Sequence, residues 1–252
     1  MFQLWHLPLL FGTGFAAGFV DSIAGGGGLI TMPVLLSFGF DPLDALGTNK
    51  LQATFGSGSA TWHYTKAGAA SPGDCKRGFA ITFAAAAAGT MLVRCLPSDF
   101  LRRFIPVLLI LVAVHSLFRP NLGETETRPR MRRGTFDLLF GLLIGFYDGF
   151  FGPGTGTFWA MAFVLALGLQ FTRATAQAKV MNFASNLSSL VFFLPGGHVV
   201  PWAGVTMGFG QLLGARLGSR TVVKHGARLI RPVFISAVLA ITVKLLYDVY
   251  RK

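Results

Sequence analysis

The chain has 252 residues, of which 52% are hydrophobic and only 13% are charged, and its formal net charge is +12 at pH 7. Soluble domains carry about 25% charged residues, so this composition argues against a soluble domain and favours an integral membrane protein. The arginines lie in short loops between apolar stretches, where the positive-inside rule explains the positive charge without a nucleic-acid partner.

Apolar segments follow one another along the chain, five in each half. In the first half they cover residues 4–23, 29–38, 42–64, 78–96 and 100–118. In the second half they cover residues 135–151, 157–167, 171–194, 202–222 and 228–250. A full membrane span needs about 20 residues, so the second segment of each half is expected to be short and re-entrant. No strand pattern competes, and an all-α membrane protein is predicted.

A glycine-rich break separates the first two segments of each half. The first break is Gly25, Gly26, Gly27 and Gly28, and the second is residues 152–156, Gly-Pro-Gly-Thr-Gly. An interior glycine costs a helix about 1 kcal/mol relative to alanine. Freed backbone groups at membrane depth are tolerated only inside protein or beside a water-filled cavity. Two broken segments at matching places in two halves indicate a transporter binding site.

The two halves resemble copies of one unit. The matched residues include Gly14 and Gly141, Asp21 and Asp148, Gly25 and Gly152, and Lys50 and Lys179. Matched Asp and Lys residues are harder to obtain by chance than matched glycines. The sequence therefore predicts a first transmembrane repeat at 1–118, a cytoplasmic linker at 119–134 and a second transmembrane repeat at 135–252.

The basic residues of the loops distinguish two topologies. If each broken segment crossed the membrane once, the loop Lys and Arg residues would divide almost equally between the two sides. If the short segment turns back, most of them share one side, as the positive-inside rule requires. An odd number of crossings makes the halves inverted repeats, with the linker in the cytoplasm and both termini outside.

Lys50 and Lys179 lie well inside the third segment of their halves. A charge near the bilayer centre costs at least about 2.5–3.5 kcal/mol on insertion scales, so it usually faces a cavity or a partner. Each lysine starts a polar stripe at helical spacing: Thr54, Ser57 and Thr61 follow Lys50, and Asn182, Asn186 and Ser189 follow Lys179. The alternative is that both lysines snorkel to the membrane surface.

The half-helices expected to begin at Gly28 and Gly156 would present free N–H groups and positive dipole ends, which bind anions. With the two lysines, they would form a centre suited to a small anion. The residues expected to bind substrate are Gly25, Gly26, Gly27, Gly28, Asn49, Lys50, Gln52, Gly152, Gly154, Gly156, Gln177, Lys179 and Asn182, with Gln211 as a further cavity residue. The alternative role of glycine is close helix packing, which the spacing of Gly210, Gly214 and Gly218 fits well.

Asp21 and Asp148 close the first helix of each half, just before the break. They are candidates for proton coupling, for an ion pair with a lysine, or for a cap on the following turn. No catalytic residue, metal site or cofactor is predicted. Cys75 and Cys95 are isolated thiols, the histidines show no ligand spacing, and the glycine runs lack the Gly-Lys-Ser/Thr ending of an ATP-binding P-loop.

Two stretches resemble the signatures of the sulfite exporter TauE/SafE family. Residues 21–30, Pro33 and residues 48–52 resemble the first signature, and residues 145–156 with 176–179 resemble the second. The resemblance covers nearly the whole chain. It implies a multi-span carrier of the bacterial inner membrane, from a family linked to export of sulfite, sulfoacetate and related organosulfur anions.

These observations predict a secondary transporter that exports a small organosulfur anion or oxyanion with proton coupling. Its partners would be the anionic substrate, protons and the lipid bilayer, with homo-oligomerisation left open. An anion channel with the same central site is the alternative. An intramembrane enzyme is a third hypothesis, which the sequence favours less because no nucleophile–base pair is recognisable.

Overall fold

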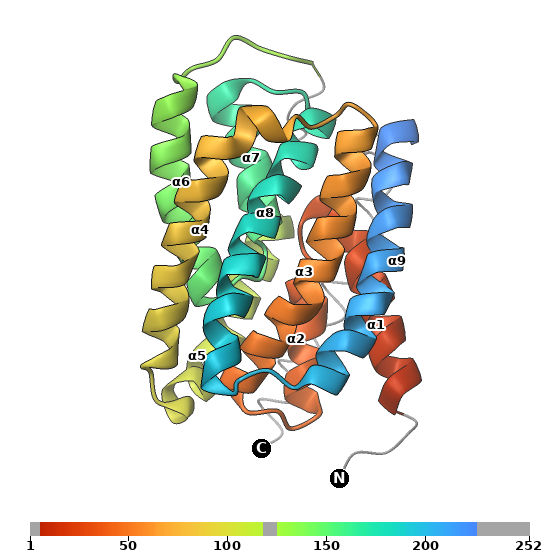
Figure 1. Cartoon of the computed structure of the whole chain (residues 1–252), viewed down its shortest axis with the longest axis vertical. Helices are drawn as coiled ribbons and strands as arrows, with labels where there is room; N and C mark the ends of the chain where they lie inside the picture. The colour runs from red at the N-terminus through yellow and green to blue at the C-terminus, as the bar shows by residue number, and fades with distance from the viewer. Residues whose placement is uncertain (1–5, 118–124, 226–252) are drawn as a thin grey trace.

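The computed structural model describes residues 6–117 and 125–225, and all regular structure in these ranges is helical (Figure 1). The helices of the first half are α1 (His6–Ala24), α2 (Gly28–Ser37), α3 (Pro42–Lys66), α4 (Pro72–Arg94) and α5 (Ser98–Leu117). Those of the second half are α6 (Arg133–Phe150), α7 (Thr155–Leu167), α8 (Phe171–Phe193), the 3₁₀ turn η1 (Leu194–Gly196) and α9 (Pro201–His225). The all-α prediction is confirmed for these ranges, and the last predicted segment, 228–250, lies outside them.

The glycine breaks interrupt the helices as predicted. Helix α1 ends at Ala24 because Gly25 adopts a left-handed conformation with φ +79°, and α2 starts at Gly28. In the second half, Gly152 and Gly154 have φ values of +97° and +83° between α6 and α7. Helix α7 begins at Thr155, one residue before the expected start at Gly156.

Helices α1 and α2 form a pair. The start of α1 and the end of α2 lie together at the lower end of Figure 1. The rings of His6 and Phe38 meet there edge to face, 4.8 Å apart between centroids. Helices α6 and α7 form a second pair. The start of α6 and the end of α7 lie at the upper end of the figure. There, Thr127 N–H donates to the Gly168 carbonyl at 2.9 Å and Arg130 N–H to the Ala166 carbonyl at 3.0 Å. Both glycine breaks consequently lie in the interior.

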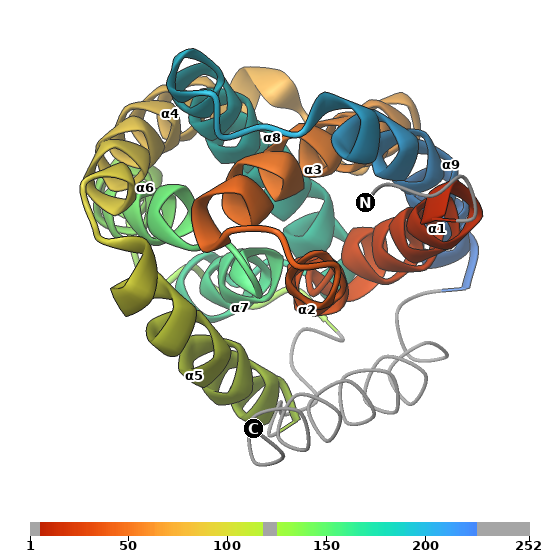
Figure 2. The same ribbon diagram turned by 90° about the horizontal axis from the view of Figure 1, so that it is seen from below.

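The long helices α9, α3, α8 and α4 connect these two pairs. Helix α1 packs on α9, α9 on α3, α3 on α8, α8 on α4, and α4 on α6 (Figure 2). The contact of α1 with α9 depends on glycine: a Cβ at Gly210 or Gly214 would overlap the carbonyl oxygen of Phe11 or Phe15, respectively. The packing role predicted from the spacing of these glycines is confirmed.

The outer surface of the molecule is rich in apolar side chains, and polar side chains are buried in the interior beside two apolar clusters. Exposed leucine and phenylalanine side chains, such as Leu143 on α6 and Phe209 on α9, face outward, whereas Lys50, Lys179 and the asparagines of α3 and α8 are buried. Such an arrangement suits a lipid surrounding, where polar groups face the bundle interior. Among the described helices, α1 alone has the length and hydropathy of a membrane span, and α2 and α7 are apolar but shorter.

Candidate functional site

The two buried lysines form ion pairs that cross between the halves. Lys50 Nζ on α3 donates to Asp148 Oδ1 at 2.6 Å and also to the main-chain oxygen of Asp148 at the end of α6. Lys179 Nζ on α8 donates to Asp21 Oδ2 at 2.7 Å, near the end of α1. The lysine side chains are 1% and 0% exposed, respectively. The snorkelling alternative is therefore wrong.

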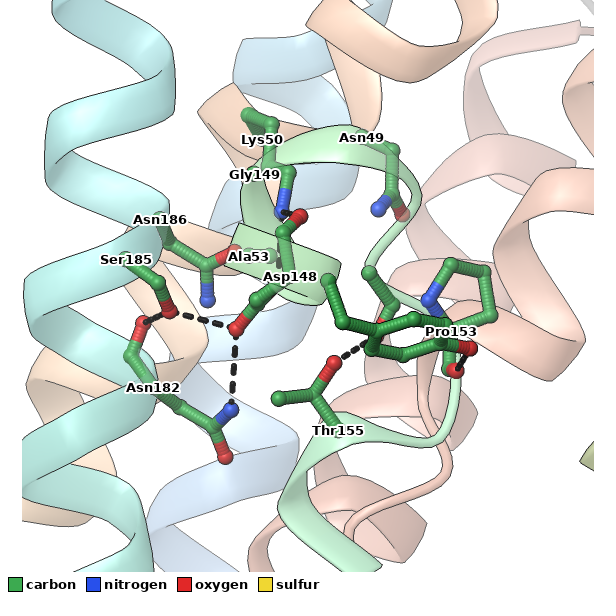
Figure 3. A network of polar contacts seen from close by, with 12 residues as sticks. Asn49, Lys50, Ala53, Asp148, Gly149, Pro153, Thr155, Asn182, Ser185 and Asn186 are labelled. Carbon is green, nitrogen blue, oxygen red and sulfur yellow. Dashed lines mark hydrogen bonds and ion pairs between the residues drawn. The ribbon is translucent and has the colours of Figure 1, made fainter. Parts of the chain in front are cut away.

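Asp148 is enclosed by polar side chains of α8 in addition to Lys50 (Figure 3). Its Oδ2 accepts hydrogen bonds from Asn182 Nδ2 at 3.3 Å and from Ser185 Oγ. Both carboxylate oxygens are consequently occupied, and the side chain is 3% exposed. Gly152 permits this arrangement, because a Cβ at that position would lie 2.9 Å from Lys50 Nζ.

Asp21 has a simpler environment. Its Oδ2 accepts from Lys179, and its Oδ1 accepts from the Gly27 N–H at 3.1 Å, directly before α2 begins. The sequence left proton coupling, an ion pair and a cap as alternatives for this residue, and the structure contains the ion pair and the cap. The side chain is 23% exposed, and its carboxylate occupies the start of α2, where an anionic ligand was expected.

The two glycine breaks touch each other through their backbones. A Cβ at Gly25 would overlap the carbonyl carbon of Gly156, and a Cβ at Gly156 would lie 2.6 Å from Gly25 Cα. The Thr157 hydroxyl donates to the carbonyl of Ala24 at 2.8 Å. A Cβ at Gly28 would lie 3.0 Å from Pro153 Cα. Close backbone approach therefore holds the ends of α1 and α7 together.

A polar cavity of about 30 Å³ lies where the breaks meet the third helices. A water molecule needs about 10–15 Å³ by this measure, so the cavity has room for about two. The residues lining it are Asp21, Gly25, Gly28, Asn49, Lys50, Ala53, Asp148, Gly152, Gly154, Thr155, Gly156, Asn182, Asn186 and Gln211. Among these, Asn182 Oδ1 is buried and has no partner in the described structure.

Some expected binding residues lie elsewhere. Gly26 and Gly27 belong to the first break without lining the cavity. Gln52 is buried behind Asn49 and donates to Asn49 Oδ1 at 2.7 Å. Lys179 lies behind Asp21. Each of the two lysines is paired with an aspartate, so the centre lacks the excess positive charge that two lysines without partners would give to an anion site.

Gln177 belongs to a different cluster. Its Oε1 accepts from Arg133 at 2.7 Å, and Arg133 also pairs with Asp137 Oδ1 at 3.0 Å. The guanidinium group lies 5.4 Å from the ring centroid of Phe163. An open depression of about 820 Å³ adjoins this cluster and is lined by Arg130, Arg132, Arg133 and Arg173, among others.

Ala53 and Thr155 line the cavity although the sequence did not single them out. Ala53 carries no chemical signal, but it lies three residues after Lys50 and therefore on the same face of α3. Thr155 belongs to the second break and was passed over in favour of its glycines. In the described ranges, no three His, Cys, Asp or Glu residues lie close enough to hold a metal ion.

Comparison with known proteins identifies the family. The family described as sulfite exporter TauE/SafE matches residues 10–245. The chain belongs to this family.

Curated relatives of this TauE/SafE chain carry the description "probable membrane transporter protein". The Escherichia coli K12 protein YfcA is 45% identical over 242 residues, covering 96% of this chain and 90% of the relative. The Sinorhizobium protein ORF9 is 43% identical, with 96% and 93% coverage. A Haemophilus influenzae protein is 42% identical, with 96% and 95% coverage. No solved structure matches the chain. The chain is thus a membrane transporter and not an enzyme.

Proposed function

We propose that this TauE/SafE chain is a secondary transporter of the bacterial inner membrane that exports a small oxyanion or sulfonate with proton coupling. The observation that supports this most strongly is the pair of buried, crosswise Lys–Asp bridges beside a polar cavity. Buried ion pairs add little net stability, because desolvation offsets their attraction. Ionisable groups inside a membrane usually mark a substrate or proton path.

The substrate binds between the two breaks after they separate. The cavity of about 30 Å³ has room for about two waters, so an oxyanion with four or more heavy atoms enters only when the surrounding helices move apart. The short helices α2 and α7 are suited to this motion, since each is joined to its partner helix by a few glycine-rich residues. Alternating access in transporters is largely such a rigid-body movement around a fixed site.

The two halves act as inverted repeats with multiple membrane crossings, divided at 1–118, 119–134 and 135–252. The opposite directions of the α1–α2 and α6–α7 pairs support this assignment. In this arrangement each pair is re-entrant. The arginine-rich segment at 128–133 is cytoplasmic, as the positive-inside rule requires.

The proposed topology predicts where fused reporters are active. A reporter inserted after Arg128 is expected to be active in the cytoplasm, and a reporter fused after Lys252 is expected to be active outside. Alkaline phosphatase and a fluorescent protein, which report the outer and inner sides respectively, measure both positions. Cytoplasmic activity of the Lys252 fusion would contradict the inverted arrangement.

Transport is expected to depend on the cation of the Lys179–Asp21 pair. The double variant Lys179→Met/Asp21→Asn stays electrically neutral but has no ammonium group for the anion. Because a hydrogen bond to a charged group contributes about 1.5–3 kcal/mol, sulfite or methanesulfonate flux into proteoliposomes should fall about 10- to 100-fold.

The matched control for this variant is Arg173→Gln. Arg173 and Glu126 form an ion pair whose side chains are 53% and 52% exposed, so its loss should leave flux unchanged. Equal flux in the double variant and the wild type would show that Lys179 does not bind substrate. Voltage-driven anion current without any proton movement would instead identify a channel.

A further inference from the structure

The two Lys–Asp bridges occupy equivalent positions in the halves but are built differently. Asp148 is 3% exposed and accepts hydrogen bonds from Lys50, Asn182 and Ser185. Asp21 is 23% exposed, and its carboxylate accepts from one side chain, that of Lys179, and from one backbone N–H. Asp21 can therefore leave its lysine at a smaller loss of contacts than Asp148 can.

Asp21 also stands between its lysine and the cavity. Asp21 lines the cavity, whereas Lys179 does not and is 0% exposed. The Lys179 ammonium lies against the start of α7, because a Cβ at Gly156 would lie 3.1 Å from Lys179 Nζ. Lys50 and Asp148, in contrast, both line the cavity while paired with each other. Movement of the Asp21 carboxylate would thus open a path from the cavity to Lys179.

We propose that Asp21 is the proton carrier of this transporter: its protonation breaks the bridge to Lys179 and frees that ammonium to bind the substrate anion. The Lys50–Asp148 bridge stays closed through the cycle and positions α3 against α6. This inference rests on the proposed transport function and assigns its coupling step to one of two residues that look equivalent in the sequence.

The charge at the site balances in this step. In the empty state, the Lys179 ammonium and the Asp21 carboxylate sum to zero. A proton from the aqueous phase converts the carboxylate to a neutral carboxylic acid, and a monovalent anion then takes its place beside Lys179, so the sum is again zero. No covalent bond to the substrate forms or breaks. One proton therefore accompanies each anion bound.

The groups around Asp21 allow this assignment. The helices packed on α1 contribute Lys179 from α8 and two groups from α3. The Tyr64 hydroxyl donates to the Ser22 carbonyl at 2.8 Å, and Lys50 lines the same cavity as Asp21 but is paired with Asp148. Helices α2 and α7 contain no titratable side chain. On α9, the group beside the cavity is the neutral Gln211, and Arg216 and Arg220 lie toward His63. Lys179 is thus the charged partner from which protonation detaches Asp21.

The step has a consequence for direction. A monovalent anion that moves with one proton carries no net charge, so an inward proton gradient would favour its uptake. A divalent anion that moves with one proton carries one negative charge, and a membrane potential that is negative inside favours its export. Export of a monovalent sulfonate by this mechanism therefore needs an outward concentration gradient of the anion, whereas a divalent oxyanion, such as fully ionised sulfite, is also driven out by the membrane potential.

Proton counting during binding tests the assignment. Methanesulfonate is the probe, because its acid is too strong to exchange protons in the working range. Calorimetric titration of the full-length protein in two buffers with different ionisation enthalpies gives the protons taken up per anion. The wild type is expected to take up one. Asp21→Asn, which mimics the protonated acid, should bind methanesulfonate without proton uptake and with affinity independent of pH.

Variants on the other bridge are the matched comparison. Ser185→Ala and Asp148→Asn are expected to retain proton uptake on binding. The Ser185→Ala variant keeps all charges, so it provides the comparison if Asp148→Asn does not fold. Proton uptake that persists in Asp21→Asn, or that disappears in Ser185→Ala, would overturn the assignment.

An infrared measurement tests the same assignment without any substrate. As the pH of the empty protein is lowered, the carbonyl stretch of a protonated carboxylic acid should appear in the wild type and in Ser185→Ala. The other acidic residues of the chain contribute to this band as well, so the signal is the component that belongs to Asp21, and that component should be missing in Asp21→Asn. If this signal behaves as expected but no anion is transported, the proposed function fails while the proton site stands. If the signal remains in Asp21→Asn, the proton site itself is wrong.

Discussion

Gly25→Ala and Gly156→Ala are expected to destabilise the centre of the molecule strongly. The two glycines meet backbone to backbone, and neither main chain can rotate away as a side chain could. An alanine at residue 25 would also have to adopt φ near +79°, which costs about 1–2 kcal/mol. Overpacking adds about 1–3 kcal/mol, so Gly25→Ala should lose about 2–5 kcal/mol and Gly156→Ala about 1–3 kcal/mol. Thermal unfolding in detergent measures both effects, and transport should be lost with them.

Two other glycines serve as controls that separate the cost of backbone strain from the cost of the steric overlap. Gly68 has φ +72° with open space around its Cβ position, so Gly68→Ala reports backbone strain alone. Gly12 has open space and no positive φ, so Gly12→Ala should be neutral or stabilise α1 slightly. If Gly25→Ala were no worse than Gly68→Ala, the contact between the breaks would contribute nothing to stability.

Breaking the Lys50–Asp148 bridge from one side should cost about 3–5 kcal/mol, because the remaining charge is left buried without its partner. Lys50→Met and Asp148→Asn are each expected to show this loss in thermal unfolding. The double variant should lose less than the sum of the single variants, since it contains no unpaired charge. Asn182 and Ser185 would still find hydrogen-bond partners on an asparagine at residue 148.

The exposed ion pair between Arg173 and Glu126 is the control for this comparison of single and double variants. Arg173→Met should change stability by about 1 kcal/mol or less, because surface pairs are weak. Strictly additive effects of Lys50→Met and Asp148→Asn would mean that the two side chains do not stabilise each other. The close contact between them would then have no energetic consequence.

The helices could be predicted well from the sequence because their signals are local. The glycine runs at 25–28 and 152–156 mark the breaks by their backbone preferences alone, and the segment lengths distinguish α2 and α7 from the longer helices. The matching of Asp21 with Asp148 and of Lys50 with Lys179 between the halves likewise indicated that these four residues belong to one central site. All four are buried or partly buried at the centre.

The pairing of these residues could not be predicted, because it depends on how one half lies against the other. Periodicity places Lys50 on a polar face of α3, but nothing within that half shows that the face meets Asp148. The same limit explains Gln177. Its position two residues before Lys179 turns it to a different side of α8, toward Arg133. A sequence pattern gives the face of a helix but not the neighbour of that face.

The crosswise bridges also constrain how the chain is made. Asp148 follows Lys50 by 98 residues, and Lys179 follows Asp21 by 158 residues. At a synthesis rate of about 5–20 residues per second, Asp148 is made about 5–20 s after Lys50, and Lys179 is made about 8–30 s after Asp21. During that time the first half contains two charged side chains whose partners have not yet been made. We expect it to complete its insertion only when the second half arrives, so two separately translated halves should rescue each other when they are produced in the same cell.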